Sequence, residues 1–284
     1  MPHLLFHGPP GTGKTSCMVA IAKELHGANN YKHMTLELNA SDDRGINVVR
    51  DQIKSFCSTQ QLMSRGVKLV ILDECDSMTS AAQFALRRIV EKYSKTTRFC
   101  LICNYVAKVI PALQSRCTRF RFGPLTDEAI GPKLTEVCTS EGLTLSDEAH
   151  KAIISLSRGD MRKVMNILES CSLTYKEIPL TKIYEVTGRP SPEDIEEIYR
   201  TLTADDYQTA MRTFMRLKTE KSLSLDDIVR DLHKCVMETA FEDNMKMFLV
   251  QRLSEVEFRL ASGVTEKPQV ASIVGAFIEI RQAK

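Results

Sequence analysis

Five short apolar runs, rich in β-branched and aromatic residues, occur in the first 125 positions of the chain, and amphipathic stretches separate them. The runs are typical of strands, and apolar residues at three- and four-residue spacing in the stretches are typical of helices. The predicted strands are Leu4–His7, Met34–Leu38, Lys68–Leu72, Phe99–Asn104 and Thr118–Phe122, and the predicted helices are Lys14–Leu25, Ile46–Ser58, Ala81–Tyr93 and Ile110–Ser115. Such alternation predicts a parallel sheet with helices on both faces.

The pattern changes after residues 123–124, Gly-Pro, where the predicted strands stop. Residues 193–284 read as helix throughout, with turns at 222–224 and 262–268, and a Gly-Arg-Pro-Ser-Pro break at 188–192 precedes them. The helices expected before the break are Thr126–Ser140, Ser146–Ser157, Met161–Thr174 and Thr181–Val186. We therefore predict an α/β core at 1–124, a small helical domain at 125–188 and an all-α domain at 189–284.

The composition limits the class of protein. The chain has 284 residues, of which 43% are hydrophobic, and a net charge of +2. That charge neither requires nor excludes nucleic acid, so any nucleic-acid site must be a local patch. The nine cysteines are scattered and odd in number, which predicts reduced thiols rather than a disulfide framework. Cys100 and Cys103 have no second Cys/His pair, which argues against zinc. No run reaches the ~20 apolar residues of a membrane span, and no signal peptide is visible.

The first loop carries the clearest candidate chemistry. Residues 8–15 read Gly-Pro-Pro-Gly-Thr-Gly-Lys-Thr between a predicted strand and a predicted helix, which is the context of a phosphate-binding loop. Its glycines let backbone N–H groups surround a polyphosphate, and the helix N-terminus adds partial positive charge. Lys14 is expected to contact the β- and γ-phosphates, and Thr15 to hold Mg²⁺. The predicted nucleotide-binding residues of this loop are Gly8, Pro9, Pro10, Gly11, Thr12, Gly13, Lys14, Thr15 and Ser16.

A second part of the site follows the third predicted strand. The run from 67 to 72 is apolar apart from Lys68, as in a strand buried on both faces, and it ends in Asp73-Glu74. Carboxylates at the C-terminal ends of parallel strands lie where open α/β sheets bind their ligands. We expect Asp73 to orient Mg²⁺ through water and Glu74 to polarise the attacking water as a general base.

Three further positions narrow the class of phosphate-binding protein. Asn104 ends the strand predicted to lie beside Asp73, residues 115–117 read Ser-Arg-Cys, and residues 159–162 read Gly-Asp-Met-Arg at the start of a helix. Together they resemble the AAA+ ATPases, in which Asn104 would be sensor one, Arg162 sensor two and Arg116 an arginine finger. Taken alone, Asn104 reads equally well as a strand-ending turn residue, and Arg116 as half of a surface ion pair.

Longer stretches make the resemblance more specific. Residues 39–45 read Asn-Ala-Ser-Asp-Asp-Arg-Gly, residues 86–88 Leu-Arg-Arg, and residues 110–122 Ile-Pro-Ala-Leu-Gln-Ser-Arg-Cys-Thr-Arg-Phe-Arg-Phe. They resemble the small subunits of replication factor C, the eukaryotic loader of the sliding DNA clamp, and most of all the subunit 3/5 type. The resemblance covers nearly the whole chain, although the last helices match only as a collar of the right length. The chain departs from the family in Cys75, where Ala is usual, and in Lys163, where Arg is usual.

The resemblance implies a machine and its partners. Small subunits of this family form a hetero-pentameric spiral in the nucleus, bind ATP and Mg²⁺ at subunit interfaces, and load the sliding clamp onto primer–template DNA for replication and repair. Arg116 would then serve the ATP of a neighbouring subunit. Arg44 and Arg50, at the start of the helix 46–58, and Lys108, at the start of another, would follow the DNA backbone. Taken singly, each of these three reads more readily as a solvated charge.

Two other implications concern the edges of the core. The segment 77–84, with Met78 and Phe84 available, would lie toward the clamp, although half of its apolar surface can belong to the core.

Family members carry a few dozen residues before the first strand, which help to enclose the adenine. The printed sequence begins almost directly on that strand, so we expect weaker nucleotide affinity with unchanged phosphate chemistry.

Two alternatives remain beside the ATPase subunit. A nucleotide-binding scaffold would contribute Arg116 to a neighbour and hydrolyse little ATP itself, but the residues expected for hydrolysis, such as Lys14, Glu74 and Asn104, are all present. The motor of another AAA+ machine, such as a branch-migration helicase, would need a winged-helix domain after residue 188, and the helical pattern argues against one.

Overall fold

The computed structural model describes residues 1–41, 46–59 and 66–282. Within these residues the chain forms two compact units. The first comprises Met1–Val137 and Ile153–Asn166, and the second comprises Cys138–Ala152 and Ile167–Lys284.

A five-stranded parallel sheet forms the centre of the first unit, in the order β2-β3-β4-β1-β5. Its strands are β1 (His3–His7), β2 (Thr35–Asn39), β3 (Lys68–Asp73), β4 (Thr97–Cys103) and β5 (Cys117–Arg121). All five are predicted from the apolar runs, with ends that differ by at most two residues from the expected bounds. The predicted α/β fold with a parallel sheet is therefore confirmed.

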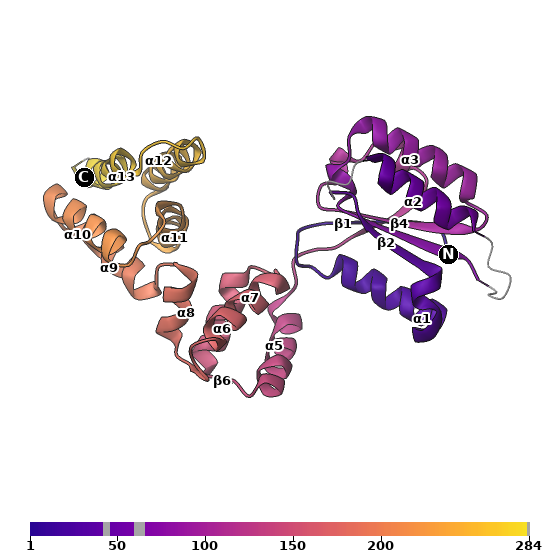
Figure 1. Cartoon of the computed structure of the whole chain (residues 1–284). Helices are drawn as coiled ribbons and strands as arrows, with labels where there is room; N and C mark the ends of the chain where they lie inside the picture. The colour runs from indigo at the N-terminus through magenta and orange to yellow at the C-terminus, as the bar shows by residue number, and fades with distance from the viewer. Residues whose placement is uncertain (42–45, 60–65, 283–284) are drawn as a thin grey trace. The chain divides into compact units, whose positions relative to one another are not determined.

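Helices cover both faces of this sheet, and Figure 1 shows α1 on one side with α2 and α3 on the other. The helices of this part are α1 (Lys14–Met34), α2 (Ile46–Ser58), α3 (Ser80–Tyr93) and α4 (Pro111–Gln114). A separate hydrophobic core lies on each face of the sheet, and alternate residues of β1 contribute to each. Leu4 and Phe6 pack with Met18 of α1, whereas Leu5 packs with residues of α2 and α3. The inner strands β1, β3 and β4 are buried on both faces, which explains why they read as continuous apolar runs, whereas the edge strand β5 is largely exposed.

Local signals in the sequence explain several element boundaries. The predicted end of the first helix, Leu25, lies two residues before Gly27, whose φ of 72° and ψ of 153° interrupt α1. The side chain of Thr79 caps the N-terminus of α3 by accepting a hydrogen bond from the Ala82 N–H at 3.4 Å. Gly188, in the left-handed conformation at φ 63°, ends a helix just where the Gly-Arg-Pro-Ser-Pro break predicts a stop.

The expectation that strands stop after residue 124 is wrong. A two-stranded parallel sheet pairs β6 (Thr144–Leu145) with β7 (Glu177–Ile178) in the second unit. Each of these strands has two residues, which is too short to produce the alternation by which strands are found in a sequence. The helices in this part of the sequence are α5 (Asp127–Glu141), α6 (Asp147–Ser157), α7 (Met161–Ser172) and α8 (Leu180–Thr187), each within two residues of its predicted bounds.

The rest of the second unit is helical, as the sequence predicts. Its helices are α9 (Pro192–Ala204), α10 (Tyr207–Glu220), α11 (Leu225–Glu238), α12 (Asp243–Ala261) and α13 (Glu266–Gln282). One hydrophobic core joins them, and each contributes a side chain without exposed surface: Ile198, Phe214, Leu232, Val256 and Val274. Ser191 and Asp194 form a capping box at the start of α9, so the chain re-enters helix directly after the break.

No helix in the described parts of the chain combines the length and the apolar composition that crossing a membrane requires.

Candidate nucleotide-binding and catalytic site

The loop between β1 and α1 has a backbone that favours glycine. Gly11 and Gly13 have φ of 70° and 85°, in the left-handed region. Gly11 also packs closely against Asp160, the residue before α7. A Cβ atom placed on Gly11 would come within 1.6 Å of Oδ1 of Asp160. The loop therefore needs glycine at position 11 for its backbone angle and for close packing.

The N-terminus of α1 faces this loop and is available to an anion. Gly13 is the capping residue, and no side chain in the described part of the chain caps this end. The first N–H groups of a helix lack partners within the helix, and they carry partial positive charge. A phosphate group is the ligand for which such an end is suited.

Lys14 is the first residue of α1, and its side chain folds back over the loop. Nζ donates hydrogen bonds to the carbonyl oxygens of Gly8 at 2.8 Å and Pro9 at 2.6 Å, and to Oδ1 of Asn104 at 3.1 Å. Only 7% of the residue is exposed. Burial lowers the pKa of Lys14, and the nearby carboxylate of Asp73 acts in the opposite direction. The ammonium group is thus held at the mouth of the loop beside the end of β4.

Thr15 and Asp73 meet directly across the site. The Thr15 hydroxyl donates to Oδ2 of Asp73 at 2.6 Å, while Oδ1 of Asp73 accepts from the backbone N–H of Glu74 at 2.8 Å. A hydroxyl and a carboxylate from two elements thus come together, and oxygen ligands of this kind suit Mg²⁺, which completes its shell with water and phosphate oxygens. The residues present therefore fit a magnesium ion.

Glu74 has an unusual backbone conformation. Its φ of 52° and ψ of 37° are left-handed, which is uncommon for a residue other than glycine. Left-handed residues at the end of a strand turn the chain sharply, and here Asp73 and Glu74 both line the same pocket. Strained conformations of this kind often occur at functional sites.

Asn104 follows β4 and is fixed by an aspartate from the loop after β3. Oδ2 of Asp76 accepts hydrogen bonds from the backbone N–H groups of Asn104 at 3.2 Å and Tyr105 at 3.0 Å. The Asn104 side chain then accepts from Lys14, as described above. Asp76 therefore joins the ends of β3 and β4, a role that the sequence did not reveal.

A pocket of about 560 Å³ collects these groups within the first unit. It is lined by Pro10, Gly11, Thr12, Gly13, Lys14, Thr15, Ser16, Asp73, Glu74, Asn104, Leu125, Met161, Arg162, Met165 and Asn166. Gly8 and Pro9 contribute to the site through their carbonyl oxygens, which hold Lys14. The structure thus brings together the predicted loop, both carboxylates, the amide and the arginine of α7.

Four lining residues were missed by the sequence analysis: Leu125, Met161, Met165 and Asn166. Met161, Met165 and Asn166 lie on α7, where the four-residue spacing of the two methionines marks one helix face. Such a stripe is more often core than ligand site, so only the neighbouring Arg162 drew attention.

The start of α7 is attached to the phosphate loop. The backbone N–H of Met161 donates to the carbonyl oxygen of Gly11 at 3.0 Å. Oδ1 of Asp160 accepts from the N–H groups of Arg162 at 2.9 Å and Lys163 at 3.4 Å. Asp160 therefore occupies the backbone N–H of Arg162, a residue that lines the pocket.

Arg116 lies outside this pocket. Its Nη1 donates to the carbonyl oxygen of Ala112 at 2.6 Å, and its Nη2 forms an ion pair with Glu91 of α3. The alternative interpretation of Arg116 as half of a surface ion pair therefore describes its state in the isolated chain.

The expected DNA contacts also lie away from the pocket. Arg44 falls outside the described residues, whereas Arg50 on α2 and Lys108 are exposed. The expectation that Lys108 begins a helix is wrong, because Lys108 ends a short 3₁₀ turn at Val106–Lys108. Its ammonium group lies 5.2 Å from the centre of the Tyr105 ring. Its carbonyl oxygen accepts from the buried side chain of Gln83 at 3.0 Å, which fixes the backbone here.

Three family models match successive parts of the chain. They are the ATPase family associated with various cellular activities (AAA) at residues 4–125, the RFC1-like AAA+ ATPase lid domain at 127–183, and the replication factor C C-terminal domain at 190–276. Among solved structures, the RuvB Holliday junction branch migration motor of Thermotoga maritima matches with a TM-score of 0.51 and 15% identity, over 82% of this chain and 80% of that one. At this identity the match shows a shared fold only.

Curated relatives match at much higher identity. Replication factor C subunit 5 of Mus musculus is 48% identical over 98% of this chain and 82% of its own length. Subunit 3 of Saccharomyces cerevisiae is 48% identical over 97% of this chain and 83% of its own length, and probable subunit 5 of Dictyostelium discoideum is 50% identical over 98% and 81%. The resemblance found in the sequence is therefore confirmed, and the chain belongs to the replication factor C family, among the relatives named subunit 3 and subunit 5, with an AAA-type ATPase domain in its N-terminal part.

Proposed function

We propose that this chain is an ATPase subunit of a clamp loader, which uses ATP binding and hydrolysis to load a sliding clamp onto primer–template DNA in replication and repair. The observation that carries this proposal is the single pocket in which Lys14, Thr15, Asp73, Glu74 and Asn104 converge, in a chain of the replication factor C family. Membership of that family supports a place in a hetero-pentamer with other replication factor C subunits, and work in the nucleus.

Each residue of the pocket has a role in this proposal. Lys14 and the loop amides bind the β- and γ-phosphates, and Glu74 takes a proton from the attacking water as general base. Thr15 and Asp73 hold Mg²⁺, which when bound neutralises charge on the phosphate oxygens. Asn104 orients the γ-phosphate or the water, and Arg162 contacts the nucleotide from α7. The hydrogen bonds that join Lys14 to Asn104 and Thr15 to Asp73 support these assignments, because they place all four side chains at one edge of the sheet.

Arg116 acts on the ATP of a neighbouring subunit in this proposal. A fixed cation that stabilises charge on the transferred phosphoryl group strongly accelerates hydrolysis, and delivery by a second subunit makes hydrolysis depend on assembly. The position of Arg116 supports this role, since the guanidinium is on the surface and is not among the groups that line the pocket of its own chain. Its side chain is 34% exposed.

We also propose the division into an ATPase core at 1–124, a helical lid at 125–188 and an oligomerisation collar at 189–284. The ranges of the three matching families support it. Neither alternative function is favoured. The pocket holds the predicted hydrolytic groups, which argues against a scaffold without activity, and the described residues after 188 form helices rather than a winged-helix domain.

Reconstitution with partner subunits tests the proposed function. The complete complex should load a clamp onto primer–template DNA in an ATP-dependent reaction, and a complex without this chain should fail. The isolated chain should hydrolyse ATP far more slowly than the complex, because no neighbour completes its site. Normal loading by the complex that lacks this chain would contradict the proposal.

Three basic residues form the proposed DNA contact: Arg44, Arg50 and Lys108. Replacing all three with alanine should weaken binding to DNA of any sequence, because phosphate contacts carry no sequence information. Each lost contact should lower the slope of log affinity against log salt by roughly 0.9 on duplex DNA, or roughly 2.7 for the three together. A salt titration of primer–template binding by the assembled complex measures this slope.

The matched control for this experiment replaces Lys23, Lys32 and Lys133, which are also exposed, with alanine. It removes the same charge from other surfaces, so the slope should stay near that of the unchanged complex. ATP binding should persist in both variants. Equal slopes in both variants would mean that Arg44, Arg50 and Lys108 are ordinary solvated charges.

A further inference from the structure

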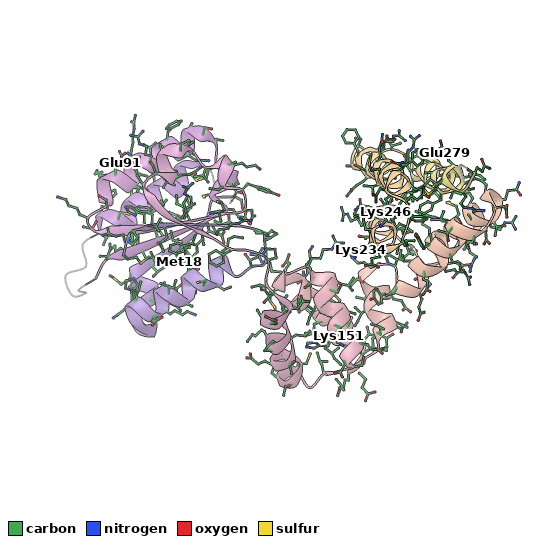
Figure 2. All side chains as sticks on the ribbon, turned by 180° about the vertical axis from the view of Figure 1, so that it is seen from behind. Met18, Glu91, Lys151, Lys234, Lys246 and Glu279 are labelled. Carbon is green, nitrogen blue, oxygen red and sulfur yellow. The ribbon has the colours of Figure 1, made fainter. Side chains whose placement is uncertain are left out.

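One exposed carboxylate, that of Glu91 on α3, contacts two arginines from different elements. Its Oε1 accepts a hydrogen bond from Nε of Arg87, one turn earlier on the helix, at 3.0 Å. The same Oε1 forms the ion pair with Arg116, which lies between α4 and β5. Figure 2 labels Glu91 in the helical layer of the first unit, on the surface of that unit. The side chain belongs neither to the nucleotide pocket nor to a core.

The contacts of Arg116 fix both ends of its guanidinium group. Nη1 is bound to the carbonyl oxygen of Ala112 in α4, and Nη2 to Glu91 in α3. A long arginine side chain on a surface would otherwise sample many rotamers. Here two helices hold it in one position while about a third of it stays exposed.

The contribution of Glu91 to folding should be small. Ion pairs at this level of exposure stabilise proteins little, because water screens them. The hydrogen bond from Arg87, followed by the charges of Arg116 and Arg87, holds the pKa of Glu91 below its usual range, so the carboxylate is ionised at neutral pH. Both guanidinium groups contact the same carboxylate oxygen, so the negative charge of Glu91 offsets the repulsion between the two arginines.

We propose that Glu91 is a positioning residue for Arg116, and that it holds the guanidinium where the ATP of a neighbouring subunit will meet it. This rests on the proposed role of Arg116 toward that neighbour. The cluster of two arginines and one carboxylate keeps a net charge of one positive unit, so it still attracts an anionic group. The hydrogen bond from Arg87 fixes the position of the Glu91 carboxylate, and the carboxylate in turn fixes the orientation of the Arg116 guanidinium.

The expected effect follows from pre-organisation. Immobilising one flexible side chain during association has a free-energy cost that corresponds to roughly 2- to 12-fold in an equilibrium or rate constant. Replacing Glu91 with alanine should therefore slow hydrolysis at the neighbour's site by roughly 3- to 10-fold. The dissociation constant of ATP at that site should stay the same, because the phosphate loop of the neighbour is untouched.

A double-mutant cycle separates positioning from a general structural role. Glu91→Ala, Arg116→Ala and the double variant are assembled into complexes in which only the neighbour's ATP site keeps its general base. Single-turnover hydrolysis and ATP affinity are measured with DNA and clamp present. If Glu91 acts through Arg116, the double variant should be no slower than Arg116→Ala alone. Glu91→Gln, which keeps the size of the side chain, replaces the alanine variant if the latter fails to assemble.

A matched control lies on α5, outside the proposed collar. Glu136 is also an exposed carboxylate in an ion pair, with Lys133 at 2.9 Å, and Glu136→Ala should leave hydrolysis unchanged. Independent, multiplicative losses from Glu91→Ala and Arg116→Ala would overturn the proposal, as would full activity of Glu91→Ala beside a slow Arg116→Ala. Full activity of Arg116→Ala would instead overturn the proposed role of Arg116, and the role of Glu91 with it.

Discussion

Replacing Lys14 with alanine is expected to abolish ATP binding by this chain at ordinary nucleotide concentrations. The substitution removes a nearly buried cation from the loop that should hold the phosphates, and it leaves the carbonyl oxygens of Gly8 and Pro9 without their donor. Truncating one partner of a buried charge pair costs about 2–5 kcal/mol, which corresponds to roughly 30- to 5,000-fold in affinity. Equilibrium binding of a fluorescent ATP analogue to the assembled complex measures the loss.

The control for this variant is Lys23→Ala, which removes an exposed lysine from the same helix and should leave the affinity unchanged. Thermal melting of both variants shows whether a loss of binding reflects the site or the fold. Undiminished ATP affinity in a folded Lys14→Ala chain would remove Lys14 from the phosphate site.

Replacing Glu74 with glutamine is expected to retain ATP binding and to block turnover. Glutamine has nearly the same shape as glutamate, so the left-handed turn after β3 and the hydrogen bond from the Glu74 N–H to Asp73 can persist. An amide accepts no proton from water, and loss of a general base slows a reaction by roughly 10²- to 10⁴-fold. Single-turnover hydrolysis by the complex, with ATP binding measured in parallel, tests this separation.

Glu37→Gln serves as the matched control, because Glu37 is an exposed carboxylate on the adjacent strand β2. It should bind and hydrolyse ATP at the normal rate. The assignment of Glu74 as general base fails if Glu74→Gln turns over ATP at the rate of the unchanged complex. A variant that neither binds nor hydrolyses would instead show that Glu74 supports the pocket itself.

The sequence predicts the sheet and its helices well, for physical reasons. An inner strand buried on both faces must be apolar along its length, as β3 is from Leu69 to Leu72, and the short length and β-branched residues of such a run indicate a strand. The phosphate loop is equally clear, because its glycines are needed for particular backbone angles. Both signals are local and need no knowledge of distant contacts.

Only the tertiary structure decided which distant residues meet. Met161 and Met165 line the pocket because α7 is bonded to the loop at Gly11, and nothing in their own spacing distinguishes them from core residues. Asp76, which follows β3, accepts a hydrogen bond from the backbone N–H of Asn104, which follows β4. Glu91 of α3 forms an ion pair with Arg116, which follows α4. The paired strands β6 and β7 are likewise held by neighbours rather than by their own pattern.

By itself, then, the amino-acid sequence determined the parallel sheet, the helical second half and the family, because each is encoded in periodicity or in contiguous motifs. The partners of individual side chains depended on folding, since hydrogen bonds and ion pairs form between segments that lie tens of residues apart in the chain. The state of Arg116 shows the difference most clearly. The resemblance of its motif implied an arginine that serves a neighbouring subunit. The fold places Arg116 on the surface, where it pairs with Glu91 and donates to the carbonyl oxygen of Ala112, and no local pattern in the sequence encodes the contact with Glu91.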